Sequence, residues 1–235
     1  MTASAHELAA LRTVATHLGA LRAEMVFVGG MIRSLLISDP AAPPARPTDD
    51  VDVIAAIATL PEYYAIAEKL RRLGFREDQS AGAPLCRWII HGLKVDVMPD
   101  HENVLGFSNR WYPLARETAT WHTIGNEDLH RIRVVDAPHF VATKLESFRG
   151  RGGGDFYHHD VEDFIAIVDG REELLRELTS CPELVRAFIA AEVCSLMTDN
   201  AFVEALPGHL AGDKASQARL SIVEKRLVGI AALQT

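Results

Sequence analysis

The sequence predicts an α/β (α+β) domain with a small mixed sheet over residues 1–136 and a mostly helical C-terminal domain over residues 137–235. Two observations support the first domain: a short apolar strand ends in two glycines, and aspartates alternate with valines in two later segments. A third observation supports the second domain. From residue 160 onward, apolar residues recur every three or four positions, which is the spacing of amphipathic helices.

The first glycine-rich segment predicts a phosphate-binding turn. Residues 25–28, MVFV, are short and rich in β-branched and aromatic residues, as in a buried strand, and Gly29 and Gly30 follow directly. A helix is expected over residues 31–37. Its first turn would present bare backbone N–H groups and the positive end of the helix dipole to an anion. Arg33 in that turn either faces the incoming phosphate or is an ordinary solvated arginine.

A pair of carboxylates follows an irregular loop. Residues 38–47 contain four prolines and cannot form regular structure. In the strand that begins after Thr48, alternation with a period of two places Asp50 and Asp52 on one face and the intervening valines on the other. Two carboxylates on one face repel each other unless a cation neutralises them, and Mg²⁺ prefers hard oxygen ligands. The alternative is a pair of surface aspartates on an edge strand.

A third carboxylate is expected beside this pair. Residues 86–91 and 93–98 are strand-like and flank Gly92, which predicts a tight hairpin. In the second of these strands Asp96 lies mid-strand, and it adjoins the Asp50 strand if the sheet has the usual neighbouring order. A third metal ligand explains an acid in this position. Further elements are expected at residues 5–20, 61–73, 131–135, 138–149 and from about residue 157, whereas residues 100–130 show no clear period.

Composition limits the environment and the partners. No segment has the length and apolarity of a membrane span, and the N-terminus lacks the layout of a signal peptide. Three widely spaced cysteines favour reduced thiols, so we expect a cytoplasmic protein. The net charge of −8 disfavours polyanions over the surface as a whole. A nucleic-acid acceptor would need a local basic cluster, for which the candidates are Arg131, Arg133, Arg149 and Arg151.

These motifs resemble a known superfamily. The segments GGMIRSLL, RPTDDVDVI and KVDVM are similar to those of the nucleotidyltransferases of the DNA polymerase β superfamily. With the later Lys144, Arg149 and the helix that carries Asp160 and Asp163, they resemble the AbiEii-type nucleotidyltransferases, the toxin halves of certain bacterial toxin–antitoxin pairs. The resemblance spans roughly residues 25–170. The sequence departs from the family pattern in a longer interval between Gly30 and Asp50 and in His159, where the family often has a basic residue.

The resemblance implies a nucleotidyltransferase fold and a Mg²⁺- or Mn²⁺-dependent enzyme that moves a nucleotide from an NTP to an acceptor hydroxyl. In this mechanism two metal ions clamp the attacking and leaving oxygens. Asp50 and Asp52 would bind both ions, while Asp96 would bind the catalytic ion and accept the proton of the acceptor. The implied nucleotide-binding residues are Gly29, Gly30, Arg33 and Lys144.

Several alternatives remain open at this point. Lys144 is either a triphosphate contact from the second domain or a salt-bridged surface lysine. Asp160 and Asp163 lie three residues apart, so they form either an edge of the site or partners of Arg and Lys that fix the second domain; we favour the latter. A transition-metal cluster at His158, His159 and Asp160 is disfavoured, because adjacent side chains on a helix diverge.

The acceptor is not specified by the sequence. A tRNA, a protein hydroxyl or a small molecule would each fit, and the toxin resemblance implies an antitoxin as a protein partner. The alternative functions are an antibiotic nucleotidyltransferase of the aminoglycoside or lincosamide kind and a non-catalytic, partner-binding member of the fold. The presence of all three acids favours an active enzyme.

Overall fold

The computed structural model describes residues 5–43, 46–124 and 131–234, which form two compact units. The sheet unit comprises residues 3–32 and 46–136, and the helical unit comprises residues 33–45 together with the chain from residue 137 onward. The last passage between the units falls after residue 136, and the segment 33–45 groups with the C-terminal helices.

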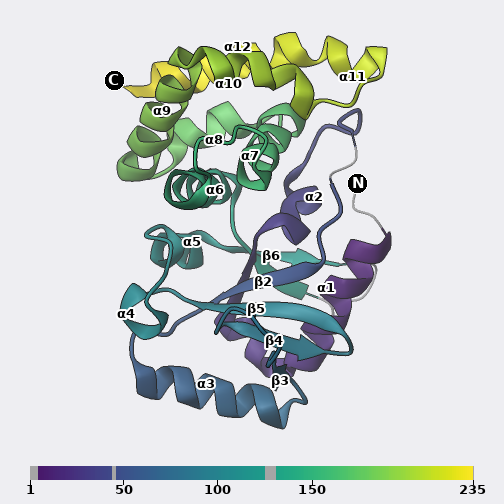
Figure 1. Ribbon diagram of the computed structural model, residues 1–235, viewed down its shortest axis with the longest axis vertical. Helices are drawn as coiled ribbons and strands as arrows, with labels where there is room; N and C mark the ends of the chain where they lie inside the picture. Colours follow the sequence, from purple (N-terminus) through teal and green to yellow (C-terminus); the bar gives the residue numbers. More distant parts are fainter. Residues whose placement is uncertain (1–4, 44–45, 125–130, 235) are drawn as a thin grey trace. The chain divides into compact units, whose positions relative to one another are not determined.

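A mixed seven-stranded sheet forms the centre of the sheet unit (Figure 1), with the order β3-β4-β5-β2-β1-β7-β6. Its parallel pairs are β2 with β5 and β1 with β7, and its other pairs are antiparallel. The strands are β1 (Met25–Val28), β2 (Asp50–Ala55), β3 (Arg76–Glu77), β4 (Arg87–Ile90), β5 (Leu93–Pro99), β6 (Thr120–Thr123) and β7 (Arg131–Val134).

The core of the sheet unit follows from the apolar pattern of the strands. All four residues of β1 are buried, and Val51 and Val53 of β2 are buried while Asp50 and Asp52 alternate with them. Helix α3 begins with a capping box between Thr59 and Glu62. The helices of this unit are α1 (Ala5–Leu18), η1 (Gly19–Glu24), η2 (Gly30–Ile32), α3 (Leu60–Arg72), α4 (Glu102–Leu105) and α5 (Tyr112–Thr118).

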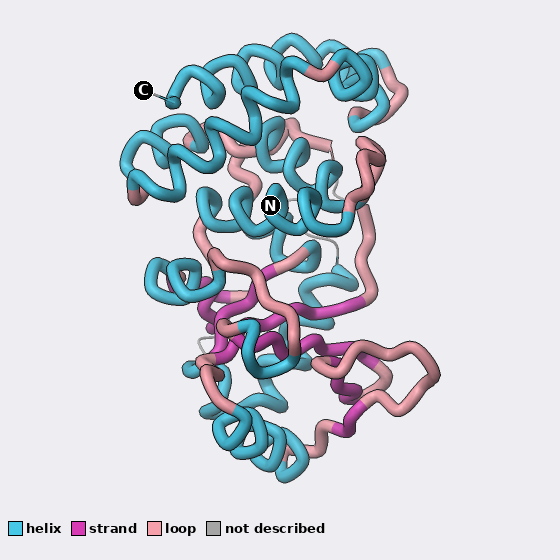
Figure 2. The backbone as a smooth tube through the Cα atoms, turned by 60° about the vertical axis from the view of Figure 1, so that its left-hand side comes forward, coloured by secondary structure: helices cyan, strands magenta, loops and turns pink. Residues whose placement is uncertain are grey.

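The described residues of the helical unit form helices and loops and no strand (Figure 2). The segment 33–43 is anchored within this unit, because the backbone N–H groups of Ser38 and Asp39 both donate to the carbonyl of Gly170. The helices are α2 (Arg33–Leu36), α6 (Ala137–Arg151), α7 (His159–Gly170), α8 (Leu174–Ser180), α9 (Glu183–Thr198), α10 (Asn200–Ala205), η4 (Leu206–His209), α11 (Lys214–Ala218), α12 (Leu220–Ala231) and η5 (Ala232–Gln234).

The predicted fold class is confirmed: a mixed sheet with helices is followed by a helical C-terminal part. The expected helix over residues 31–37 is instead a short 3₁₀ turn, η2, followed by the four-residue helix α2. In the chain that the structure describes, no helix is both long enough and apolar enough to cross a membrane.

Candidate active site

The candidate site is built on the parallel pair of strands β2 and β5. Their register places Asp50 opposite Lys94 and Asp52 opposite Asp96. Because side chains at paired positions of neighbouring strands point to the same face, the three aspartates converge. One carboxylate oxygen from each can be chosen so that all three lie within 4.8 Å of one another. The expected neighbourhood of Asp96 and the Asp50 strand is thus present in the structure.

The carboxylates differ in exposure and in partners. The side chain of Asp50 is 37% exposed and accepts a hydrogen bond of 3.0 Å from the hydroxyl of Thr48, whereas the side chain of Asp96 is 11% exposed. Two like charges at the short separation within this group repel each other, and burial strengthens that repulsion. A cation close to the group would relieve this repulsion.

An arginine that sequence reasoning missed supplies one such cation. Arg87 on β4 donates from Nε to Oδ1 of Asp96 at 2.8 Å and from Nη2 to Oδ2 of the same residue at 2.7 Å. Its Nη2 also donates to Oδ2 of Asp50 at 3.2 Å. These hydrogen bonds, chiefly the pair to Asp96, raise the pKa of Arg87 above its ordinary value, so the guanidinium stays charged.

The signal for Arg87 was present in the predicted hairpin. A tight turn at His91 and Gly92 pairs Ile90 with Leu93, and the antiparallel register then places Arg87 directly opposite Asp96. Opposite charges at paired positions of one face are close enough for a salt bridge. The neighbouring Cys86 is a different case, because burial raises the pKa of its thiol to about 12 and keeps it protonated.

Gly29 brings the glycine-rich turn against the carboxylates. Its φ is +76°, in the left-handed region that favours glycine, and an added β-carbon would lie 1.8 Å from Oδ2 of Asp52. Gly30 begins η2 and is buried. The glycines and the aspartates are therefore parts of one arrangement. With only short helices after the turn, backbone N–H groups contribute more to any phosphate contact than a helix dipole does.

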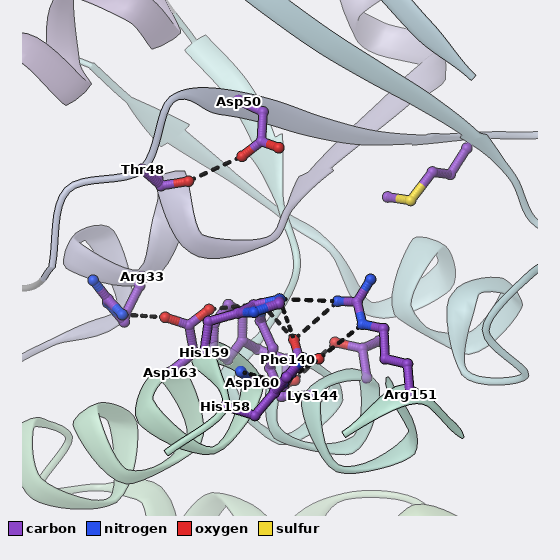
Figure 3. A network of polar contacts seen from close by, with 12 residues as sticks. Arg33, Thr48, Asp50, Phe140, Lys144, Arg151, His158, His159, Asp160 and Asp163 are labelled. Atoms are coloured by element: carbon purple, nitrogen blue, oxygen red, sulfur yellow. Dashed lines mark hydrogen bonds and ion pairs between the residues drawn. The ribbon is translucent and has the colours of Figure 1, made fainter. Parts of the chain in front are cut away.

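Four other predicted residues form a buried ion network inside the helical unit (Figure 3). Arg33, with a side chain 1% exposed, pairs with Asp163. The Nζ atom of Lys144 lies 2.6 Å from Oδ2 of Asp163 and 3.2 Å from Oδ1 of Asp160. Arg151 completes the network with a hydrogen bond of 3.0 Å from Nε to Oδ2 of Asp160. These are the pairs required by the alternative in which Asp160 and Asp163 fix the second domain.

The electrostatics of Asp160 are set by this network. Burial raises the pKa of its carboxyl, but Lys144 and Arg151 outweigh burial and hold that pKa below its ordinary value. The expectation that the side chains of His158 and His159 diverge is wrong, because His158 is the N-cap residue of α7 and does not have helical backbone geometry. Potential ligand atoms of His158, His159 and Asp160 lie within 4.8 Å of one another. The ammonium and guanidinium already balance the Asp160 charge, so a metal ion there would have to displace them.

The protein is similar in structure to a nucleotidyltransferase-like protein of known structure. This neighbour is an antigenic nucleotidyltransferase-like protein from Paracoccidioides brasiliensis, with a TM-score of 0.52 and 19% sequence identity over 86% of this chain and 92% of that chain. The likeness shows that the chain has a nucleotidyltransferase fold with a helical C-terminal part. No protein-family model matches the sequence, and comparison with curated proteins found no match.

Proposed function

We propose that the protein is a nucleotidyltransferase that uses Mg²⁺ or Mn²⁺ to move a nucleotide from an NTP to an acceptor hydroxyl. The observation that carries this proposal is the convergence of Asp50, Asp52 and Asp96 on two adjacent strands of a nucleotidyltransferase fold. A fold alone does not define the chemistry of a protein. Phosphoryl transfer depends mainly on positioning and on charge neutralisation, and a carboxylate trio beside a glycine-rich turn provides most of the groups that this requires.

The donor set fits a magnesium site. All three candidate ligands are carboxylates, which are the hard oxygen donors that Mg²⁺ and Mn²⁺ prefer, and their oxygens approach within 4.8 Å of one another. Nitrogen or sulfur ligands, which would favour zinc, do not belong to this trio. When bound, the metal would supply charge neutralisation for the transferring phosphoryl group and would orient the attacking and leaving oxygens.

The protein residues then have separate roles. Asp50 and Asp52 would hold the metal ions, while Asp96 would hold the catalytic ion and would accept the proton of the acceptor hydroxyl. Gly29 and Gly30 allow the phosphates of the NTP to approach the backbone.

The two basic residues of the helical unit receive different assignments. For Arg33 we propose a structural role, because its side chain is buried against Asp163. Lys144, with a side chain 10% exposed, remains our candidate for a phosphate contact. Asp163 pairs with both Arg33 and Lys144, so the positions of these two side chains depend on each other whichever role each has.

The finer assignment is a toxin-type enzyme of the AbiEii kind that acts on tRNA or on a protein hydroxyl and is controlled by an antitoxin. It rests on the motifs that span both units, from the glycine pair to the Lys144 and Asp160 helices. A small-molecule acceptor is the second candidate, because the net charge of −8 favours a cationic antibiotic over a polyanion. A non-catalytic role is the third, and the engagement of Asp96 by Arg87 favours it.

The test is a transfer assay. The protein is incubated with each α-labelled NTP and Mg²⁺, together with total tRNA, a cell lysate or aminoglycosides, and covalent label is followed on each acceptor. The Asp50→Asn, Asp52→Asn double variant is the control. Label that requires Mg²⁺ and is absent with the control supports the proposal and identifies the acceptor class. Absence of label on every acceptor, with no metal-dependent binding of NTP, would contradict it.

A further inference from the structure

Arg87 is hydrogen-bonded to two of the three carboxylates that would hold a metal ion, those of Asp96 and Asp50. Its three hydrogen bonds engage both oxygens of Asp96 and one oxygen of Asp50. The guanidinium side chain is 18% exposed, so it is held within the sheet unit and does not lie free on the surface. A fork that is bidentate to one carboxylate and shared with a second is a strong and geometrically specific contact.

The well-exposed arginine pairs of this unit differ from the Arg87 pair. Arg71 pairs with Glu77 through side chains that are 52% and 43% exposed, a pair of the kind that contributes little free energy. Arg87 instead neutralises part of a three-carboxylate cluster in a site of lower dielectric. Removal of Arg87 would therefore leave the cluster more negative and its oxygens open to a divalent cation.

We infer that Arg87 is an internal competitor for the metal ion, so that the metal binds productively only together with its nucleotide. This inference rests on the proposed function, because it concerns the same three carboxylates. In the absence of nucleotide, a divalent cation must displace a bidentate guanidinium from Asp96. An NTP changes that balance, since its phosphates offer the displaced guanidinium an anionic partner and bring the metal ion already coordinated.

The consequence is a coupling between metal and nucleotide that can be measured. If each ligand displaces the same guanidinium, each raises the affinity for the other by the same factor. Arg87 would thus act as a positioning residue that opposes metal binding until a nucleotide binds. A purely structural arginine would affect stability but would not change the ratio of metal affinities with and without nucleotide.

The experiment compares Mn²⁺ affinity in the full chain by isothermal titration, with and without a non-hydrolysable NTP analogue. The variants are Arg87→Gln, which removes the charge, and Arg87→Lys, which keeps the charge but loses the fork. Arg76→Gln is the matched control, since it removes an exposed arginine from the edge strand β3 of the same sheet. Thermal unfolding in EDTA reports whether each variant is folded before titration.

The expected result is a roughly tenfold gain in Mn²⁺ affinity for Arg87→Gln without nucleotide, and a smaller enhancement of that affinity by the analogue than in the wild type. The Mn²⁺ affinity of Arg87→Lys should lie between those of Arg87→Gln and the wild type, and that of Arg76→Gln should match the wild type. If both Arg87 variants bind Mn²⁺ no more tightly than the wild type does without nucleotide, the inference is overturned while the proposed function stays intact. If no form binds Mn²⁺, with or without the analogue, the proposed function fails together with the inference.

Discussion

Gly29 and Asp52 lie so close together that no side chain other than hydrogen fits between them. Val28 pairs with Asp52 across the antiparallel strands β1 and β2, and the chain then turns at Gly29 with a φ of +76°. A β-carbon at Gly29 would lie 1.8 Å from Oδ2 and 2.6 Å from the carboxyl carbon of Asp52. The glycine is thus a steric requirement of the carboxylate as well as of the turn.

This contact predicts a specific defect in Gly29→Ala. The methyl group must displace the Asp52 carboxylate, and the positive φ adds strain, so we expect a loss of about 2–4 kcal/mol in the free energy of unfolding. Mn²⁺ affinity should fall at the same time. Gly92→Ala is the matched control, since Gly92 has a φ of +81° but open space around its β-position. Urea unfolding of both variants separates the clash from the backbone strain. Equal losses would show that Asp52 moves aside freely.

The aspartates should differ when they are replaced singly. Asp52→Asn is expected to abolish Mn²⁺ binding with little loss of stability, because it relieves like-charge repulsion. Asp96→Asn should also abolish binding, but it leaves the guanidinium of Arg87 without its bidentate partner and should cost about 2–4 kcal/mol. Isothermal titration and urea unfolding measure the two effects. Retained Mn²⁺ binding in both variants would exclude the trio as the metal site.

The buried network of the helical unit predicts a stability that depends on pH. The pKa of Asp160 in the folded protein is below its ordinary value of 3.8, so its contribution is present above about pH 4 and is lost as pH falls through the folded pKa. Asp160→Asn should lower the free energy of unfolding by about 3 kcal/mol at pH 7. The variant should also show a smaller decline in the free energy of unfolding between pH 5 and pH 3.

Urea unfolding across this pH range, with the exposed Glu204→Gln variant as the charge-matched control, checks the prediction. The control should lose little stability at pH 7 and should keep the acid-induced decline. A decline of the same steepness in Asp160→Asn would assign the acid sensitivity to other carboxylates.

The acceptor class can be recognised by its response to salt. Arg149 has a side chain 62% exposed and pairs with Glu192, so it is available to a phosphate at small cost. If tRNA is the acceptor, its affinity should fall steeply with salt, and Arg149→Ala should reduce the slope by about one. A cationic antibiotic should instead bind more tightly to that variant. Filter binding or fluorescence anisotropy at several salt concentrations distinguishes these cases.

The sequence was sufficient for the elements that carry a strong period or a clear boundary. The run at residues 25–28, the alternation at Asp50 and Asp52, and the hairpin around Gly92 all correspond to observed strands. Residues 100–124 were not assigned, because α4, α5 and β6 are short and their apolar residues follow no sustained period. Tertiary packing determines such elements more than local propensity does.

The candidate site was predictable to a similar degree. The three aspartates follow from strand alternation and a plausible sheet order. Arg87 could be found only by also deriving which residues of the two hairpin strands pair with each other. The destination of Arg33 could not be foreseen from local sequence. It depends on a contact with Asp163, 130 residues away, and on the grouping of residues 33–45 with the C-terminal helices.

That grouping limits how the protein can be divided or recombined. The chain passes between its two units after residues 32, 45 and 136, so no single cut separates them. A fragment ending at residue 136 would retain Arg33 and Asp39 but would lose Asp163 and Arg219, to which they are bound. Exchange of the C-terminal helices with those of a relative would therefore succeed only if the short 33–45 segment were exchanged with them. That segment is part of the unit that must be transferred in any natural or engineered recombination.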